Sequence, residues 1–136
     1  MDYSKLSDQE INGLVMDAIS DGNQAYRGGD GSAIKLLHQI NTVEFGEHVE
    51  REEVYAKFDP CNNAADAWPI IAKHQISVCA YHRANPGMKR ESWWEADIFA
   101  EFITRDDNPL RAAMIVFLKI QGSANVPVNP TGSDLR

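Results

Sequence analysis

The chain has 136 residues, a length that fits one domain, because two domains would each be near the size at which a hydrophobic core becomes marginal. Hydrophobic residues make up 43% of the chain and charged residues 24%, ordinary values for a globular protein that exclude disorder throughout. The net charge of −7 disfavours direct binding of nucleic acid, which depends on clustered Lys and Arg.

The sequence also indicates where the protein acts. No stretch approaches the roughly 20 apolar residues of a membrane-spanning helix, and the N-terminus lacks the apolar segment of a signal peptide. The two cysteines suit free thiols in a reducing compartment. We therefore expect a cytoplasmic protein that does not enter a membrane.

The first predicted element is a helix over residues 8–20. Ser7 and Glu10 have the spacing of a capping box, in which each side chain binds the other residue's amide. Behind this cap, apolar residues recur with helical spacing, at Ile11, Leu14, Val15, Ala18 and Ile19.

The next part of the chain carries weaker signals. Residues 21–32 are rich in glycine and polar residues and predict a loop, whereas residues 33–40 predict a short helix with three apolar residues on one face. Alternating apolar residues in 42–59 predict two short strands or a bent hairpin. We interpret the acids of this stretch as a solvated rim: Glu44, Glu47, Glu50, Glu52 and Glu53.

Residues 60–75 predict a second helix with two alternative starts. With Asn63 as N-cap, Pro69 would lie inside the helix, where its ring and missing N–H disturb the backbone. With Asp66 as N-cap, Pro69 falls in the first turn, where no intrahelical donor is needed. The second start is therefore favoured.

The last third of the chain predicts two strands and a helix. Residues 76–82 and 94–102 alternate in polarity, and the Asn-Pro-Gly between them favours an antiparallel hairpin. Asn108 and Pro109 then start a helix that is apolar nearly all round. Gly122 is expected to end this helix, and residues 122–136 are expected to be a disordered tail.

This order of elements predicts an α+β fold in a single domain over residues 1–121. The economical arrangement is an antiparallel sheet of about four strands with helices packed against it, similar to an α/β/α layer sandwich.

Three segments carry a family resemblance. DYSKLSDQEI (2–11), PCNNAADAWPII (60–71) and NPLRAAMIVFLKIQ (108–121) together resemble the NinX-like proteins of tailed phages and prophages. The resemblance implies a phage accessory protein that acts in the bacterial cytoplasm, and kinship with small phage domains of α/β/α sandwich type. It leaves residues 21–58 as a family-variable insertion and carries over no catalytic residue.

The cysteines and histidines give little indication of catalysis. Their spacing fits no metal site, and no cofactor is expected. Cys61 lies near a predicted helix N-terminus, which would lower its pKa and make it the better candidate nucleophile, but a structural thiol is favoured over a catalyst. Cys79 lies on a strand that we expect to be central, where a thiol is usually a small buried hydrophobe. We therefore expect a protein that is not an enzyme.

The candidate binding residues come from the family segments and from one strand. Arg111 lies in the first turn of a helix, where a cation is unfavourable, so it needs an acidic partner; a structural pair with Asp66 is favoured over a ligand. Trp93 shares a strand face with Phe99 and acids, and this face is either an interaction surface or covered by residues 21–58. The full set of candidates is Asn62, Asn63, Asp66, Trp68, Trp93 and Arg111.

These observations favour a non-catalytic protein that binds a host or phage macromolecule. A first alternative is a sponge that sequesters a small, anionic, nucleotide-like immune signal through Trp68, Asn62, Asn63 and Arg111. A second is a small enzyme that uses Cys61, and a third, weaker alternative is acidic mimicry of DNA. Formation of a homodimer is left open.

Overall fold

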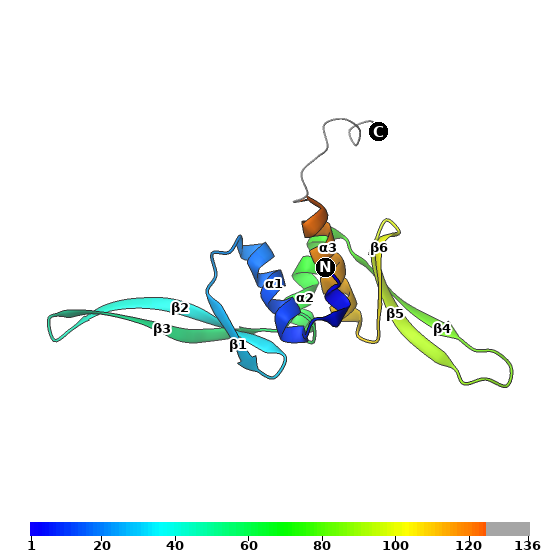
Figure 1. The fold of residues 1–136 in the computed structure, drawn as a ribbon, viewed down its shortest axis with the longest axis horizontal. Coiled ribbons are helices and arrows are strands. Elements are labelled where there is room, and N and C mark those ends of the chain that lie inside the picture. Colours follow the sequence, from blue (N-terminus) through cyan, green and yellow to red (C-terminus); the bar gives the residue numbers. More distant parts are fainter. Residues whose placement is uncertain (125–136) are drawn as a thin grey trace, which may run out of the picture.

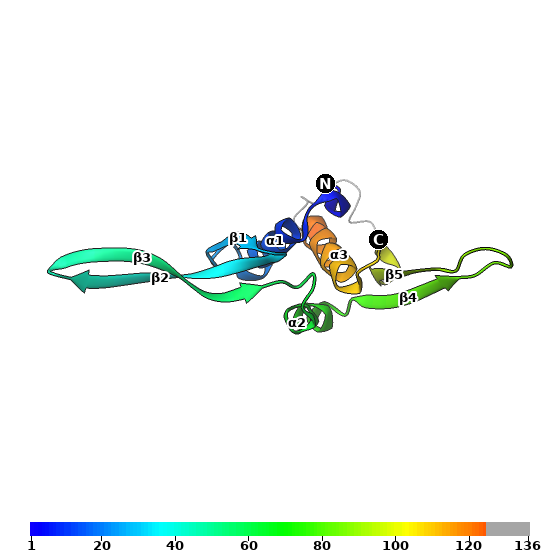
Figure 2. The ribbon, with the colours of Figure 1, turned by 90° about the horizontal axis from the view of Figure 1, so that it is seen from below.

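The helices form the centre of the molecule, and a three-stranded antiparallel sheet lies on either side of them (Figure 1). The computed structural model describes residues 1–124. Seen from below, the two sheets extend from the helices in opposite directions (Figure 2). In chain order the elements are η1 (a 3₁₀ helix, Tyr3–Lys5), α1 (Asp8–Ser20), β1 (Tyr26–Asp30), β2 (Ala33–Glu44), β3 (Glu47–Phe58), α2 (Ala64–His74), β4 (Ser77–Arg83), β5 (Glu91–Ile98), β6 (Glu101–Asp106) and α3 (Pro109–Ala124).

Helix α1 forms where the sequence predicts it. The Glu10 amide donates to the Ser7 hydroxyl, and the Ser7 amide donates to the Glu10 carboxylate, both at 3.1 Å. The predicted capping box is therefore confirmed. Ile11 and Val15 from the apolar stripe are fully buried where α1 packs against α3 and the first sheet.

The predicted loop over 21–32 is interrupted by β1 at residues 26–30, and the predicted helix over 33–40 is wrong, because these residues form the start of β2. The pairing of β2 with β3 has a β-bulge here, because Tyr55 of β3 has no partner between those of Leu36 and Leu37. The start of β2 is buried on both of its faces, so the neighbours Leu36 and Leu37 are both buried. Ile34 and Leu37 consequently recur with a spacing that imitates a helix face.

Strands β2 and β3 continue beyond the core as a two-stranded arm, which comprises residues 38–53 (Figure 1). A hairpin was one of the two predictions for 42–59 and is confirmed, although its strands are longer than predicted. Most side chains on both faces of the arm are exposed. An isolated two-stranded ribbon is marginally stable, so the arm depends on the core into which it continues.

The second sheet contains the predicted antiparallel hairpin of β4 and β5. The single strand predicted over 94–102 is wrong in its length, because β5 ends at Ile98. Phe99 and Ala100 then turn the chain with φ values of 50° and 61°, and β6 returns beside β5. Neither residue is of the type that normally marks such a turn, so the clean alternation concealed it.

Helix α2 starts after Asn63 and not at Asp66, the start that the sequence favours. The Asn63 side chain accepts a hydrogen bond from the Ala65 amide at 2.9 Å and caps the helix. The Asp66 carboxylate instead accepts a hydrogen bond from the Asp59 amide, also at 2.9 Å. Pro69 therefore lies inside the helix and removes one intrahelical bond.

Helix α3 begins as predicted, because the Asn108 side chain accepts hydrogen bonds from the amides of Leu110 and Arg111 at 2.9 and 3.2 Å. All residues from 112 to 118 are buried, as the apolar sequence predicts. The helix extends past the predicted end at Gly122 to Ala124. The rest of the predicted disordered tail, 125–136, lies outside the described residues.

The α+β fold with antiparallel sheets is confirmed, although six strands form two sheets rather than about four forming one. One hydrophobic core takes side chains from the three helices and from both sheets. No helix within residues 1–124 is both long and apolar enough to cross a membrane.

Candidate functional site

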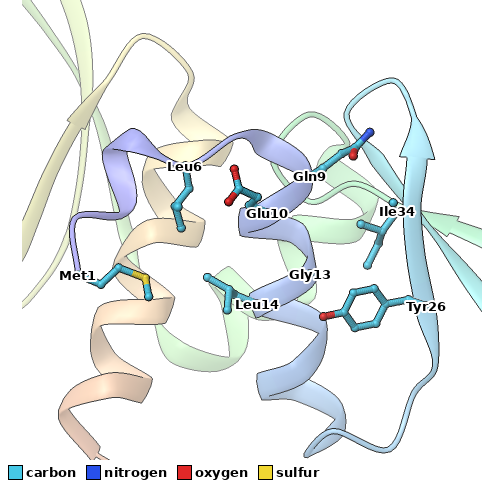
Figure 3. A pocket seen from close by; sticks show the side chains of 9 residues that line it. Met1, Leu6, Gln9, Glu10, Gly13, Leu14, Tyr26 and Ile34 are labelled. Carbon is cyan, nitrogen blue, oxygen red and sulfur yellow. The ribbon is translucent and has the colours of Figure 1, made fainter.

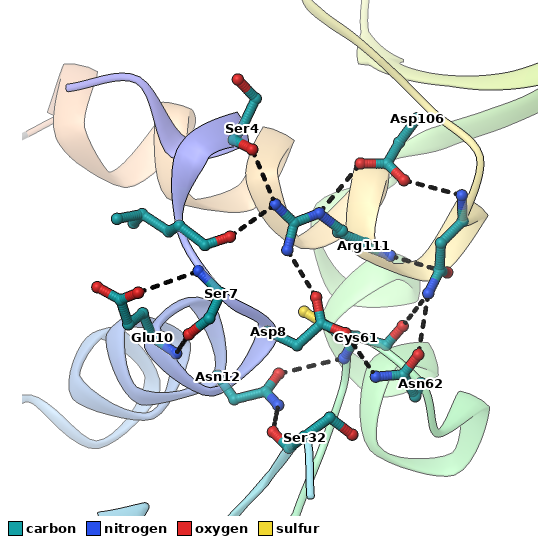
Figure 4. Close-up of polar contacts among 12 residues, drawn as sticks. Ser4, Ser7, Asp8, Glu10, Asn12, Ser32, Cys61, Asn62, Asp106 and Arg111 are labelled. Atoms are coloured by element: carbon teal, nitrogen blue, oxygen red, sulfur yellow. Dashed lines mark hydrogen bonds and ion pairs between the residues drawn. The ribbon is translucent and has the colours of Figure 1, made fainter.

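Arg111 occupies the centre of a polar cluster between the starts of α1 and α3 and the end of β6 (Figure 4). Its guanidinium lies 2.6 Å from the Asp8 carboxylate and 3.1 Å from the Asp106 carboxylate. It also donates to the main-chain carbonyls of Ser4 and Leu6, at 3.1 and 2.8 Å. Burial lowers the pKa of Arg111, but the hydrogen bond and charge of Asp8, together with the charge of Asp106, raise this pKa above its ordinary value.

The predicted pair of Arg111 with Asp66 is wrong. The carboxylate of Asp66 holds the turn before α2 through the Asp59 amide, whereas Asp8 and Asp106 surround Arg111. Two carboxylates beside one guanidinium also repel a further anion. Arg111 therefore gives no support to the sequestration of an anionic ligand, which stays a prediction.

The asparagines of the family segments connect the helix starts to one another. The side-chain amide of Asn62 donates to the Asp8 carboxylate at 2.9 Å. The side-chain amide of Asn108 donates to the Cys61 carbonyl at 2.7 Å and to the Asn62 side-chain oxygen at 3.1 Å. Asn62 and Asn108 thus satisfy polar groups where three segments meet, and the structure brings Asn62 and Arg111 into the same cluster (Figure 4).

Asn12 is a residue that the sequence analysis missed. It is fully buried in α1. Its side chain donates to the Ser32 carbonyl at 2.9 Å and to the Asp59 carboxylate at 2.8 Å, and it accepts from the Cys61 amide at 3.2 Å. Its only sequence signal is a polar side chain beside the buried Ile11, which many solvent-facing residues share.

Cys61 is a buried structural thiol, the favoured interpretation, but its predicted lowered pKa is wrong. It is fully buried, and burial, followed by the negative charge of Asp8, raises the pKa of its thiol to about 12. A protonated thiol is a poor nucleophile at neutral pH, so the geometry does not support catalysis by Cys61. The expectation for Cys79 is also wrong, because β4 is an edge strand and Cys79 is exposed.

Trp93 lies in a second cluster, on the face of the β4–β6 sheet opposite to the buried Ala96. Its ring stacks on the Tyr81 ring, with 6.0 Å between centroids and 10° between planes. The guanidiniums of Arg105 and Arg83 lie 4.3 and 5.5 Å from the Trp93 ring centroid. We call Tyr81, Arg83, Trp93 and Arg105 the aromatic–arginine surface.

The first sheet does not cover this surface. Residues 21–58 form β1–β3 on the other side of the helices (Figure 1), and Tyr81 remains 44% exposed. Of the two interpretations left open for Trp93, the structure therefore supports an accessible surface. The prediction that Phe99 shares this face is wrong, because Phe99 lies in the turn after β5.

The remaining candidate, Trp68, lies on α2 with 65% of its surface exposed. Trp68 is therefore not part of the hydrophobic core. Trp68 and Trp93 are on different elements, and the structure does not join the six predicted residues into one site.

An apolar hollow of about 430 Å³ lies between the N-terminal segment, α1 and the first sheet (Figure 3). None of the six predicted residues lines it. No group of three or more His, Cys, Asp or Glu side chains among residues 1–124 is placed to hold a metal ion. The hollow is lined by Met1, Leu6, Gln9, Glu10, Gly13, Leu14, Tyr26, Gly28 and Ile34.

Comparison with known proteins identifies the family. The family model described as "Bacteriophage P22, NinX" matches residues 2–121, a range that includes both the Arg111 cluster and the aromatic–arginine surface. No curated protein and no solved structure matches the chain. The match covers most of the 136 residues, so the chain belongs to the bacteriophage P22 NinX family.

Proposed function

We propose that the protein acts without catalysis, by binding a protein of the phage or of its host through the aromatic–arginine surface. The observation that carries this proposal is the cluster in which the half-buried Trp93 stacks on the exposed Tyr81 beside two exposed guanidiniums. Trp, Tyr and Arg are the residue types that contribute most to protein interfaces. The family suggests the setting, a bacterial cell that contains the phage genome.

The Trp93 ring is held in position before any partner binds. Its indole N–H donates to the Glu95 carboxylate at 2.8 Å, and Tyr81 lies against the ring from the neighbouring strand. A side chain that is already ordered loses little conformational entropy on binding. The arrangement therefore favours a preformed contact surface.

The arginines of the surface can exchange their present partners. Arg83 lies 3.7 Å from Glu91, and Arg105 lies 3.4 Å from Glu95, while the arginine side chains remain 55% and 58% exposed. Such exposed ion pairs contribute little to stability, so both guanidiniums can bind carboxylates of a partner. The net charge of −7 favours a protein over nucleic acid as that partner.

Two other candidate residues, Cys61 and Arg111, give no support to catalysis. Cys61 is buried with a protonated thiol, and Arg111 is balanced by Asp8 and Asp106. Each side chain is therefore explained by the packing of the fold.

Affinity capture from phage-infected cells tests the proposal. The tagged protein and its Trp93→Ala and Trp68→Ala variants are compared at several stages of infection. Trp68 is a matched control, because it is an exposed tryptophan on another element. We expect a partner that the wild type and Trp68→Ala retain and Trp93→Ala loses. Equal capture by all three proteins, or no specific capture at any stage, would contradict the proposal.

A further inference from the structure

We infer that the aromatic–arginine surface receives the tip of the acidic arm, residues 38–53, of a second copy of this chain. The inference rests on the proposed function, because it names an occupant for the same surface. Four observations carry it: the charges of the two ends of the molecule, the backbone of the arm's tip, the exposure of the side chain there, and the chemistry of the surface.

The two ends of the molecule carry opposite charge. The acidic arm contains five glutamates and one arginine. The end of the β4–β5 hairpin, residues 81–93, contains three Lys or Arg residues and one glutamate. These ends extend in opposite directions from the helices (Figures 1 and 2), so they do not neutralise each other within one copy. Between two copies they are complementary.

The tip of the acidic arm is unfavourable in a single copy. Phe45 and Gly46 form a two-residue turn with φ values of 52° and 80°. Such turns favour Asn, Asp or Gly at the first position, because a bulky side chain is strained there. Glu44 and Glu47 lie directly opposite each other across the strands, where like charges repel. Arg51 lies 3.9 Å from Glu44 and offsets part of this repulsion. Strain and repulsion together indicate that the tip is kept for a contact.

Exposure of Phe45 leads to the same conclusion. Its side chain is as accessible as in an extended chain, with a relative exposure of 104%. The ring therefore gains no packing energy that could offset its strained backbone. An aromatic side chain of this kind provides a large apolar contact when a partner covers it.

The tip and the aromatic–arginine surface match in chemistry. The tip presents one aromatic ring between two carboxylates, those of Glu44 and Glu47. The surface presents the rings of Trp93 and Tyr81 with the guanidiniums of Arg83 and Arg105 beside Trp93. Phe45 packs on the aromatic rings, and the carboxylates accept hydrogen bonds from the guanidiniums. Any other protein that displaces the arm must present an aromatic residue between carboxylates.

Charge exchange between variants tests this contact. In Glu44→Lys/Glu47→Lys the tip is basic and the surface is unchanged, and in Arg83→Glu/Arg105→Glu the surface is acidic and the tip is unchanged. Mass is measured by light scattering during gel filtration over a range of concentration, after circular dichroism shows that each variant is folded. We expect the wild type to self-associate, each variant alone to be monomeric, and the mixture of the two to associate again.

Phe45→Asn provides a test that does not depend on charge. Asn followed by Gly is favoured in this turn, so the variant keeps the hairpin while it removes the ring. We expect its self-association to weaken by at least about tenfold, as for a central contact residue. Phe99→Asn is the matched control, since Phe99 is also exposed and holds the first position of a turn with positive φ. It should associate as the wild type does.

Two results would overturn the inference: a wild type that is monomeric at every concentration, or self-association that neither charge reversal nor Phe45→Asn weakens. The proposed function fails separately. If the wild type is monomeric but Trp93→Ala still loses a captured partner, the inference is wrong and the proposed function stands. If the charge exchange succeeds and Trp93→Ala retains the captured partner, the self-contact stands and the proposed function is wrong.

Discussion

The guanidinium of Arg111 lies 2.6 Å from the carboxylate of Asp8, a residue 103 positions away in the sequence. This contact joins α3 to the first turn of α1. Asp8 also accepts a hydrogen bond from the side-chain amide of Asn62, just before α2, so the starts of the three helices are held together. The negative charge of Asp8 is favourable near a helix N-terminus. The positive charge of Arg111 is unfavourable there, so Arg111 also needs the carboxylate of Asp106 as a partner.

Replacement of Arg111 by Met should therefore destabilise the protein. The change leaves Asp8 and Asp106 without their cation in a partly buried site, which we expect to lower the free energy of unfolding by about 3 kcal/mol. Urea denaturation measures this loss. Arg27→Met is the matched control, because Arg27 pairs with Glu52 at an exposed site, and it should lower the stability by less than about 1 kcal/mol. Equal losses in the two variants would contradict this interpretation.

Asn12→Leu should be destabilising although it places an apolar side chain in the core. The Cys61 amide and the Ser32 carbonyl lose their partner in a buried site, and we expect a loss of about 2 to 3 kcal/mol. Asn41→Leu changes an exposed asparagine on β2 and should be nearly neutral. Denaturation of both variants by urea makes the comparison, and a neutral Asn12→Leu would show that the polar network is dispensable.

The sequence predicts helix starts well because a cap is a local feature. Ser7 with Glu10, and Asn108 with Pro109, each lie within a few residues of the amides that they serve. The same reasoning failed at α2, since Asp66 was drawn to the Asp59 amide. No local rule can anticipate that contact.

Features that depend on strand register could not be predicted. The burial of β2 on both faces at Leu36 and Leu37 imitated a helix, and the turn at Phe99 was concealed in regular alternation. Alternation did place Trp93 on a polar face. The neighbours that make this face a surface, Tyr81 and Arg105, come from other strands and follow only from the pairing. Asp8 and Arg111 meet for a similar reason, through packing between distant segments.

The two thiols should differ sharply in reactivity. Cys79 is exposed, whereas Cys61 is fully buried with a pKa of about 12. In the native protein a thiol reagent such as DTNB should therefore titrate one cysteine at neutral pH, and denaturant should release the second. Cys79→Ser should abolish the native reaction. Rapid modification of Cys61 in the folded protein would instead favour the enzyme alternative.

Stability should fall in acid partly because of His74. Burial, followed by the positive charge of Lys73, lowers the pKa of His74 below its ordinary 6.5, and its ring packs against Phe117. The unfolded chain takes up the proton first as the pH falls below 6.5, so protonation favours unfolding; above that pH the contribution is fully present. His74→Gln should reduce this slope in denaturation at a series of pH values. An unchanged slope would assign the acid sensitivity to other groups.

Phe45→Asn should make a single copy more stable even though it removes an aromatic residue. The Phe45 ring is fully exposed and buries nothing in the monomer, so its removal loses no packing. Asn tolerates the positive φ of 52°, and relief of the strain should raise the free energy of unfolding by about 1 kcal/mol.

Thermal unfolding at a protein concentration low enough to keep the chain monomeric measures this gain, because self-association would add stability of its own. Phe99→Asn, in the equivalent turn position of the second sheet, should show a similar increase. A decrease for Phe45→Asn alone would mean that the ring already packs within its own copy. The tip would then be occupied and could not reach the aromatic–arginine surface of a second copy.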